Sequence, residues 1–326
     1  MAWHSNIKHG IRHYISLNTI RPKIYKYSLN HGRVHINNSH HRQYKQRGFT
    51  LIELIAVIVL LGIGSVGITS LIGLATQSYI NVTDRDELIG NARFSVERLN
   101  REIRNALPNS VRTMTDSTVA PTIQCIEFVP IKASTIYTDI PVSPKPAADT
   151  LKAAKFHDEH NNDYQCATTC LDSVVVYPLN SNDVFANQFD ATGKVFGLKS
   201  VTSVGDERTL TLDAVVSFEN ESPTNRLYIV AKPVSYCITA QRIYRYEKYD
   251  YTATQVVPPD PDPITAPDVK KALMAYDVAP LDINNLPFTV LNATLQRNAL
   301  VQVKLNFTRN DENFVFNNEV HISNVP

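Results

Sequence analysis

Acidic residues are missing from the N-terminal 48 residues of this 326-residue chain. Segment 1–48 contains nine of the 32 Lys and Arg residues and seven of the ten His residues. A stretch this basic and polar cannot form a hydrophobic core, so a disordered tail and a nucleic-acid-binding arm are the alternatives. The rest of the chain keeps 23 basic residues against 31 acidic ones, a net charge of −8. That balance disfavours a soluble nucleic-acid-binding protein.

Catalytic sequence motifs are missing as well. The chain contains no GxSxG, P-loop or HExxH string, and no other group of residues suggests a nucleophile, a phosphate-binding loop or a catalytic metal. We therefore expect a protein that is not an enzyme and that needs no cofactor.

Charged side chains are almost absent from segment 49–75, where Glu53 is the one ionisable residue. A helix of this length can cross a bilayer core of about 30 Å, so the segment is predicted to be a transmembrane helix. A charged side chain at mid-membrane costs about 2.5–3.5 kcal/mol, so Glu53 is expected either to have a function or to snorkel towards the headgroups. The basic flank 1–48 predicts a cytoplasmic N-terminus and an exported C-terminal part.

Three residues at the start of this apolar run carry a specific signal: Gly48, Phe49 and Glu53. The segment Gly48–Ile63 (GFTLIELIAVIVLLGI) resembles the signature of type IV pilins and type II secretion pseudopilins. The resemblance implies cleavage after Gly48 by a prepilin peptidase and N-methylation of Phe49. It also implies that Glu53 meets the terminal amine of a neighbouring subunit during assembly. A secretory signal peptide would instead be cut after its apolar segment.

The removed leader would be residues 1–48, which is longer than most leaders of the family, and an upstream start-codon assignment would explain the excess. Beyond the membrane, segment 76–108 continues as a charged helix that ends at Pro108 and Asn109. Its apolar positions recur at steps of three and four, which predicts one face packed on a globular domain. These positions are Leu88, Ala92, Ser95, Val96, Leu99, Ile103 and Ala106.

Segment 109–326 is rich in β-strand signals and is predicted to form one periplasmic domain. We expect an α+β fold, in which the long N-terminal helix packs on an antiparallel β-sheet, with loops at Pro141–Asp163 and Val257–Asp268. The expected strands are Ile123–Pro130, Ser173–Tyr177, Leu210–Phe218, Leu227–Val230, Val234–Ile238, Arg242–Tyr246, Leu300–Phe307 and Asn313–His321.

Four cysteines allow three pairings, and an oxidising compartment favours disulfides. We favour Cys166–Cys170 together with Cys125–Cys237, which would join two strands. The alternative is a zinc site formed by Cys166, Cys170 and the histidines of segment His157–His160, although the spacing fits no strong zinc pattern. A calcium site in the loop of Asp260, Asp262 and Asp268 is also conceivable, but the acids lack an EF-hand order. We expect no metal.

Shorter sequence strings indicate a particular group within the pilin superfamily. Phe94–Arg112, Ile126–Pro130, Val174–Leu179 and Glu319–Pro326 resemble a minor pilin of the mannose-sensitive haemagglutinin pilus system. The resemblance implies a filament subunit that starts or tips a pilus. Its implied partners are other pilin subunits, the bacterial inner membrane, prepilin peptidase and the pilus assembly platform. A large minor pseudopilin of type II secretion and a filament-tip adhesin are the alternatives.

Overall fold

The computed structural model describes residues 48–118, 121–166, 170–186, 190–255, 268–291, 299–310 and 312–322. The chain divides into two compact units, Met1–Ser65 and Val66–Pro326. The predicted leader up to residue 47 lies outside the described residues, and so do Asp260 and Asp262 of the possible calcium loop.

Helix α1 runs for 54 residues, from Leu51 to Arg104. Its residues are exposed up to Thr83, and continuous burial of one face begins at Leu88. The buried positions confirm the predicted apolar face, with one polar addition, Asn100. The structure thus confirms the α+β class and the packing of the charged half of the helix on a β domain.

The helix ends four residues before Pro108, earlier than the sequence suggested. The last turn tightens, because the amide of Ala106 bonds to the carbonyl of Ile103 at 3.0 Å. The amide of Leu107 then bonds to the carbonyl of Val129 at 2.8 Å, so the chain has already joined the β domain. Hydrogen bonding to the segment between β2 and β3 therefore ends the helix before the proline can do so.

Two sheets cover the C-terminal half of α1. The first has the order β1-β2-β10-β11-β12 and the second the order β13-β14-β15. Their bounds are β1 Arg112–Asp116, β2 Ile123–Phe128, β10 Val234–Thr239, β11 Arg242–Glu247, β12 Lys270–Ala275, β13 Phe288–Leu291, β14 Ala299–Arg309 and β15 Glu312–Ile322.

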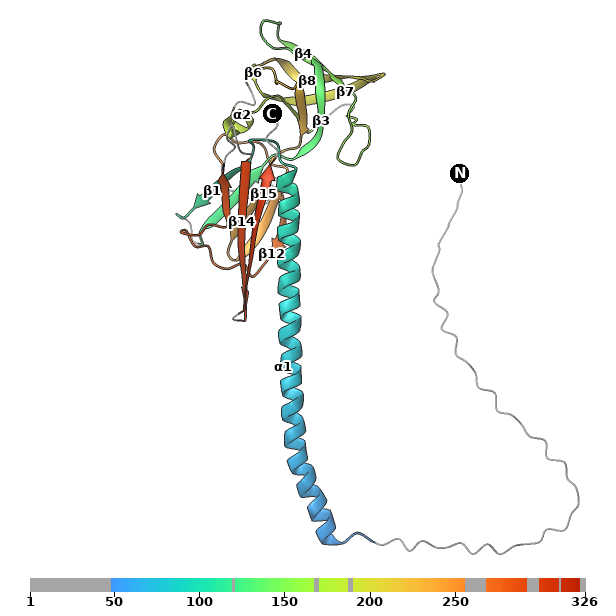
Figure 1. Cartoon of the computed structure of the whole chain (residues 1–326), viewed down its shortest axis with the longest axis vertical. Helices are drawn as coiled ribbons and strands as arrows, with labels where there is room; N and C mark the ends of the chain where they lie inside the picture. The colour runs from blue at the N-terminus through green and yellow to red at the C-terminus, as the bar shows by residue number, and fades with distance from the viewer. Residues whose placement is uncertain are drawn as a thin grey trace, which may run out of the picture. The chain divides into compact units, whose positions relative to one another are not determined.

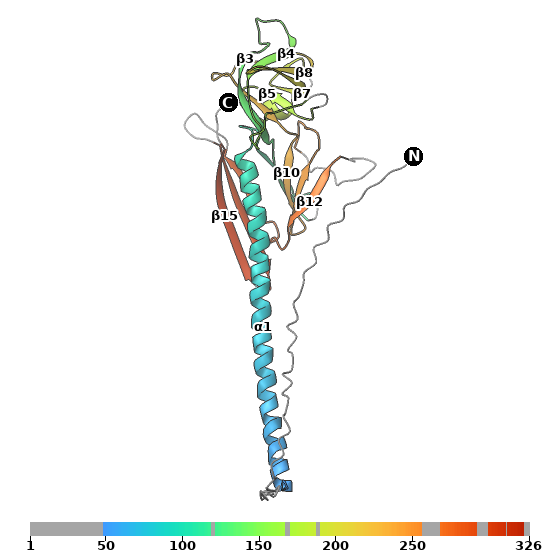
Figure 2. The same cartoon turned by 90° about the vertical axis from the view of Figure 1, so that its right-hand side faces the viewer.

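Figure 2 shows β15 on one side of α1 and strands β10 and β12 on the other. One hydrophobic core fills the space between these elements, with Leu99 and Ile103 from α1. Tyr236 from β10 and Val303 from β14 are fully buried in it. Burial at about 25 cal/mol per Å² of apolar area makes this core the main force that holds the helix to the sheets.

A separate barrel is inserted between β2 and β10 (Figure 1). Each of six antiparallel strands pairs with the next in the order β4-β3-β9-β5-β7-β8, and β8 pairs back with β4, which closes the ring. The bounds are β3 Ile131–Asp139, β4 Ala148–Ala154, β5 Ser173–Val175, β7 Val195–Val204, β8 Glu207–Phe218 and β9 Arg226–Val230. The short β6, Thr192–Gly193, adds parallel to β8, and helix α2 spans Ser181–Phe185.

This barrel corrects one expectation. Segment Pro141–Asp163 is not only loop, because it contains β4. The β-rich part of the chain also carries an inserted unit with its own core, to which all six barrel strands contribute. Leu107, Val129 and Val175 belong to a smaller cluster that connects the barrel to the rest of the β domain.

Candidate assembly helix and its supporting contacts

The N-terminus of α1 is built by Thr50 and Glu53. The amide of Glu53 donates to Oγ1 of Thr50 at 3.3 Å, and the amide of Thr50 donates to Oε2 of Glu53 at 3.4 Å. This reciprocal arrangement is a capping box, which satisfies two backbone amides that the first helical turn leaves free. Gly48 and Phe49 directly precede it, so the structure brings the three sequence-predicted residues of the N-terminal site together at one helix start.

The N-terminal half of α1, residues 51–83, presents large apolar side chains to its surroundings. Phe49 is 83% exposed, and Leu71 is 73% exposed. Within the described residues, α1 is the one helix that is long and apolar enough to cross a membrane. A surface this apolar is unfavourable in water, and it is suited to lipid or to other apolar helices.

Glu53 interrupts this apolar surface with a carboxylate. Among the described residues it forms no ion pair, and its hydrogen bonds are with Thr50. Hydrogen bonds to an amide and a hydroxyl leave its negative charge without a countercharge. A cation, such as a free amino terminus, would therefore complete the site.

The opposite end of the exposed region is fixed by an ionic cluster around Glu87. Tyr276 donates to Glu87 at 2.6 Å, and Arg309 lies 3.2 Å from the same carboxylate. The hydrogen bond from Tyr276, together with Arg309, lowers the pKa of Glu87. Arg309 also pairs with Asp277 at 2.7 Å. The cluster connects α1 to β14 and to the residues after β12 at the place where helix burial begins.

A second ionic contact holds α1 near its C-terminal end. Nε of Arg245, on β11, lies 3.0 Å from Glu102 of the helix. The same guanidinium pairs with Glu247 at 2.5 Å. Arg245 is largely buried, so these pairs are less screened by solvent than surface ion pairs.

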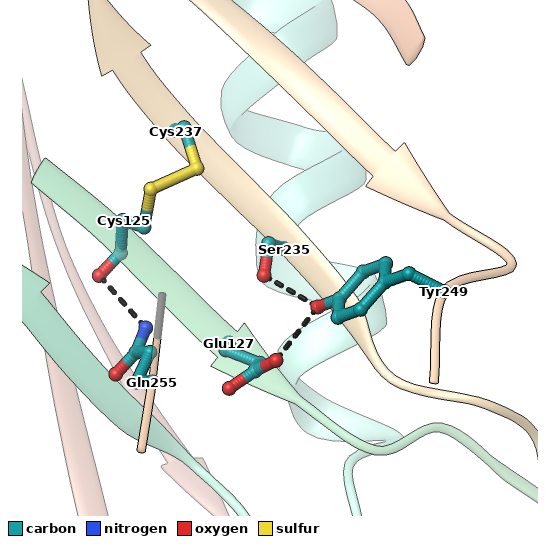
Figure 3. The surroundings of a disulfide bond; sticks show 6 residues. All are labelled: Cys125, Glu127, Ser235, Cys237, Tyr249 and Gln255. Carbon is teal, nitrogen blue, oxygen red and sulfur yellow. Dashed lines mark hydrogen bonds between the residues drawn. A yellow bond between two sulfur atoms is a disulfide. The ribbon is translucent and has the colours of Figure 1, made fainter. Parts of the chain in front are cut away.

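The disulfide Cys125–Cys237 joins directly opposed residues of β2 and β10 (Figure 3). Both cysteines are fully buried, on the face of the sheet that points away from the α1 core. Because the barrel is inserted between these two strands, the disulfide closes the segment that contains the whole barrel. The side-chain amide of Gln255 donates to the carbonyl of Cys125 at 3.4 Å.

A buried carboxylate, Glu127, lies on the same face two residues along β2. The hydroxyl of Tyr249 donates to it at 2.9 Å and shares a 2.5 Å hydrogen bond with Ser235 (Figure 3). Arg112 pairs with its other oxygen at 2.5 Å. Burial raises the pKa of Glu127, although Arg112 and Tyr249 oppose the shift, and burial likewise raises the pKa of Tyr249. The cluster is a hydrogen-bonded contact that joins β1, β2 and β10 to Tyr249.

The second disulfide joins Cys166 to Cys170 at the barrel. Both sulfurs are bonded to each other, so they are not thiolate ligands for the alternative zinc site with His157 and His160. Within the described ranges, no three His, Cys, Asp or Glu side chains gather as a metal site. Asp268 is the one residue of the possible calcium loop that the structure describes.

Sequence reasoning missed the role of Thr50 in the N-terminal site. The signal was present, because Thr50 and Glu53 have the spacing of a capping box before an apolar run. It also missed Glu127 and Arg112, because a lone acid and a lone base 15 residues apart have no recognisable pattern until the strands pair.

Comparison with known proteins supports this view of the N-terminal site. The family described as "Prokaryotic N-terminal methylation motif" matches residues 43–69. The match supports the type IV pilin and pseudopilin superfamily, and it implies processing by prepilin peptidase and assembly with other pilins. Together with the exposed apolar helix, it suits a single-pass anchor in the inner membrane. No curated protein and no solved structure gives a significant match.

Proposed function

We propose that the chain is a minor pilin, similar to MshO of the mannose-sensitive haemagglutinin pilus system, which helps to start or tip a type IV pilus. The observation that carries the proposal is the N-terminal site: a methylation motif at residues 43–69 leads directly into an exposed apolar helix with one carboxylate. Nothing in the described part of the chain argues for catalysis, and we propose no enzymatic role.

The proposed topology places the basic residues before Gly48 in the cytoplasm and the β domain in the periplasm. Prepilin peptidase would cut between Gly48 and Phe49, which leaves α1 as the anchor. Glycine suits the cleavage site, because no side chain blocks the approach of the peptidase to the backbone. The new amine on Phe49 would then supply the cation that Glu53 lacks, in this chain or in a neighbouring subunit.

The experiment is to express the full chain together with its prepilin peptidase and the pilin subunits encoded near it. Mass spectrometry should identify an N-terminal, N-methylated Phe49 in the membrane fraction, and the processed chain should be recovered with sheared pili. A mature chain that begins after Ala75 would contradict the proposal. So would a correctly processed chain that never accompanies other pilin subunits.

The inserted barrel favours a second candidate, a filament-tip adhesin. A closed barrel with its own core is not needed to pack α1, since the two sheets around Leu99 and Ile103 already do this. Glycan or surface binding by purified wild-type protein, lost on deletion of residues 131–230, would favour the adhesin. A large minor pseudopilin of type II secretion would have the same helix and is distinguished by a secretion operon around its gene.

A further inference from the structure

Strand β15 is a long strand at the edge of its sheet. It spans 11 residues, and its one partner among the described strands is β14. An unpaired edge presents a row of free backbone N–H and C=O groups, to which another extended strand can bind. Soluble proteins usually protect such edges with lysine, proline, a bulge or a cover.

The barrel and the edge strands β12 and β13 show such protection. The barrel closes on itself, and its extra strand β6 has two residues. Strand β12 carries Lys270 and Lys271. Strand β13 has four residues and lies against β2, where the side chain of Gln124 bonds to both the amide and the carbonyl of Phe288. Strand β15, in contrast, contains no Lys, Arg or Pro, and its register with β14 has no bulge.

The hairpin register identifies the groups that point outwards. Arg309 and Glu312 flank the two-residue turn and are the first pair of the hairpin. A turn of this kind makes the flanking pair a hydrogen-bonded one, and such pairs alternate along an antiparallel ladder. The backbone groups that face away from β14 are therefore those of Asn313, Val315, Asn317, Glu319 and His321. The side chains of all five are exposed, including Val315 at 54%.

The edge lies beside the proposed assembly helix. Asn310, at the hairpin tip, donates to Asp84 of α1 at 3.1 Å, and Arg85 of α1 stacks over the ring of Phe314 at 5.2 Å. Figure 1 shows the β14–β15 hairpin alongside α1 with its tip towards the exposed half of the helix, so β15 runs in the same direction as α1. A subunit packed against the exposed helix residues 66–83 would be within reach of this edge.

The direction of β15 also argues against a second copy of this chain. Two copies joined edge to edge in antiparallel fashion are related by a two-fold axis perpendicular to the strands. That axis would reverse one α1 relative to the other. Two helices anchored in one membrane with the same topology cannot adopt this arrangement, which excludes antiparallel pairing of β15 with itself and favours a strand from a different protein.

We propose that β15 is a docking edge, to which a neighbouring pilin-type subunit of different sequence adds an extended strand. The inference rests on the proposed function, because it takes its partner from the filament. The outward N–H and C=O groups of Val315 and Asn317 would bond to the main chain of the added strand. Exposed Glu319 would contribute a side-chain contact that selects the partner.

The test uses the full chain, expressed with the pilin subunits encoded near it. Asn317→Pro removes an outward N–H and no bond to β14, whereas Asn317→Thr keeps this N–H and is the matched control. Asn317→Lys is a second variant that blunts the edge without altering the backbone. A photo-crosslinking residue at Val315 reports what lies against the edge, and thermal unfolding and the processed Phe49 terminus report folding and maturation.

We expect a crosslink from Val315 to a strand of another pilin-type subunit in the wild-type and Asn317→Thr backgrounds. It should weaken about tenfold in Asn317→Pro, as expected for the loss of one hydrogen bond and its local geometry. It should also weaken in Asn317→Lys, because an exposed lysine disfavours the addition of a strand to the edge. Equal crosslinking in all variants, or a crosslink to this chain or a copy of it, would overturn the proposal even if pili form normally. If the wild-type chain itself is never recovered with pilin subunits, the proposed function fails and the docking edge fails with it.

Discussion

Thr50 and Glu53 cap α1 for one another: each backbone amide donates to the other's side chain, at 3.3 and 3.4 Å. Glu53 therefore has two separable properties, a hydrogen-bonding cap and a negative charge. The cap acts within one chain, whereas the charge needs a cation that Thr50 does not supply. Variants can remove one property and keep the other.

We predict that Glu53→Gln keeps membrane insertion and processing but weakens incorporation into the filament. Glutamine can occupy the same capping-box position, so the helix start is preserved while the charge is lost. Removing a charge also eases membrane insertion, so a poorer anchor would not explain a loss of assembly. The measurement compares processed chain in membranes with chain recovered in sheared pili, and Glu53→Leu should behave like Glu53→Gln.

Thr50→Ala is the matched control for the cap. It should destabilise the helix start by about 0.5–2 kcal/mol but retain the charge, and so retain assembly. Wild-type incorporation of Glu53→Gln would show that the carboxylate is not needed for assembly. Loss of assembly in Thr50→Ala alone would assign the effect to the cap.

The long helix could be predicted because its signals are local. Leu88, Ala92 and Leu99 repeat at helical spacing, and the structure buries all three. The end of the helix could not be placed, because the hydrogen bond of Leu107 to Val129 depends on a residue 22 positions later, between β2 and β3. A local proline signal was overridden by a tertiary hydrogen bond.

The barrel was not predicted because its closure depends on pairing between distant strands. Leu151 in β4 pairs with Leu210 in β8, which alternation along either strand cannot show. Strand β4 also reads Ala-Asp-Thr-Leu-Lys-Ala-Ala, with little of the β-branched or aromatic enrichment that marks strands. Pairing with β3 and β8 makes this segment a strand, and the segment's own residues therefore predicted a loop.

The two disulfides should differ in their effect on stability. Cys125 and Cys237 are 112 residues apart in sequence, whereas Cys166 and Cys170 are four apart. Chain-entropy estimates give about 5 kcal/mol for the long loop and about 2 kcal/mol for the short one. We predict that the double variant Cys125→Ala/Cys237→Ala loses far more resistance to urea than Cys166→Ala/Cys170→Ala, measured on detergent-solubilised full chain.

Thiol labelling checks the premise of that comparison. Wild-type protein, denatured without reductant, should label at no cysteine, because both pairs are bonded. Labelling at Cys166 and Cys170 together with bound zinc would restore the metal site as the explanation for these residues. Similar urea midpoints for the two double variants would contradict the loop-length argument.

Two leucines of α1 lie in opposite environments, one buried in the core and one exposed. Leu99 is 1% exposed in the domain core, and Leu71 is 73% exposed on the N-terminal half of α1. We predict that Leu99→Ala destabilises the β domain by about 2–5 kcal/mol, because it leaves a cavity. Leu71→Ala should leave urea unfolding of the β domain unchanged and reduce recovery in pili. Equal destabilisation by both variants would mean that the exposed half is packed by this chain itself.

The ion pair of Arg208 and Asp163 makes the barrel sensitive to acid. Arg208 is 2% exposed, and both oxygens of Asp163 lie 2.9 Å from its Nη2. The hydrogen bonds from Arg208 hold the pKa of Asp163 below its ordinary 3.8. A carboxyl group with a lowered folded-state pKa stabilises the fold in full above its ordinary value, and loses this contribution as the pH falls through the lowered one.

We predict that Asp163→Asn lowers the thermal unfolding temperature at pH 7, because a buried guanidinium loses its countercharge. The gap to wild type should begin to narrow as the pH falls below 3.8, because Asp163 of the unfolded state takes up its proton first, and it should close below the lowered pKa of folded Asp163. Glu207→Gln is the matched control, since its pair with Lys152 is exposed and such pairs contribute little. A gap between Asp163→Asn and wild type that stays constant down to pH 2.5 would show that shape and hydrogen bonding at this position, and not its charge, hold Arg208 in the barrel.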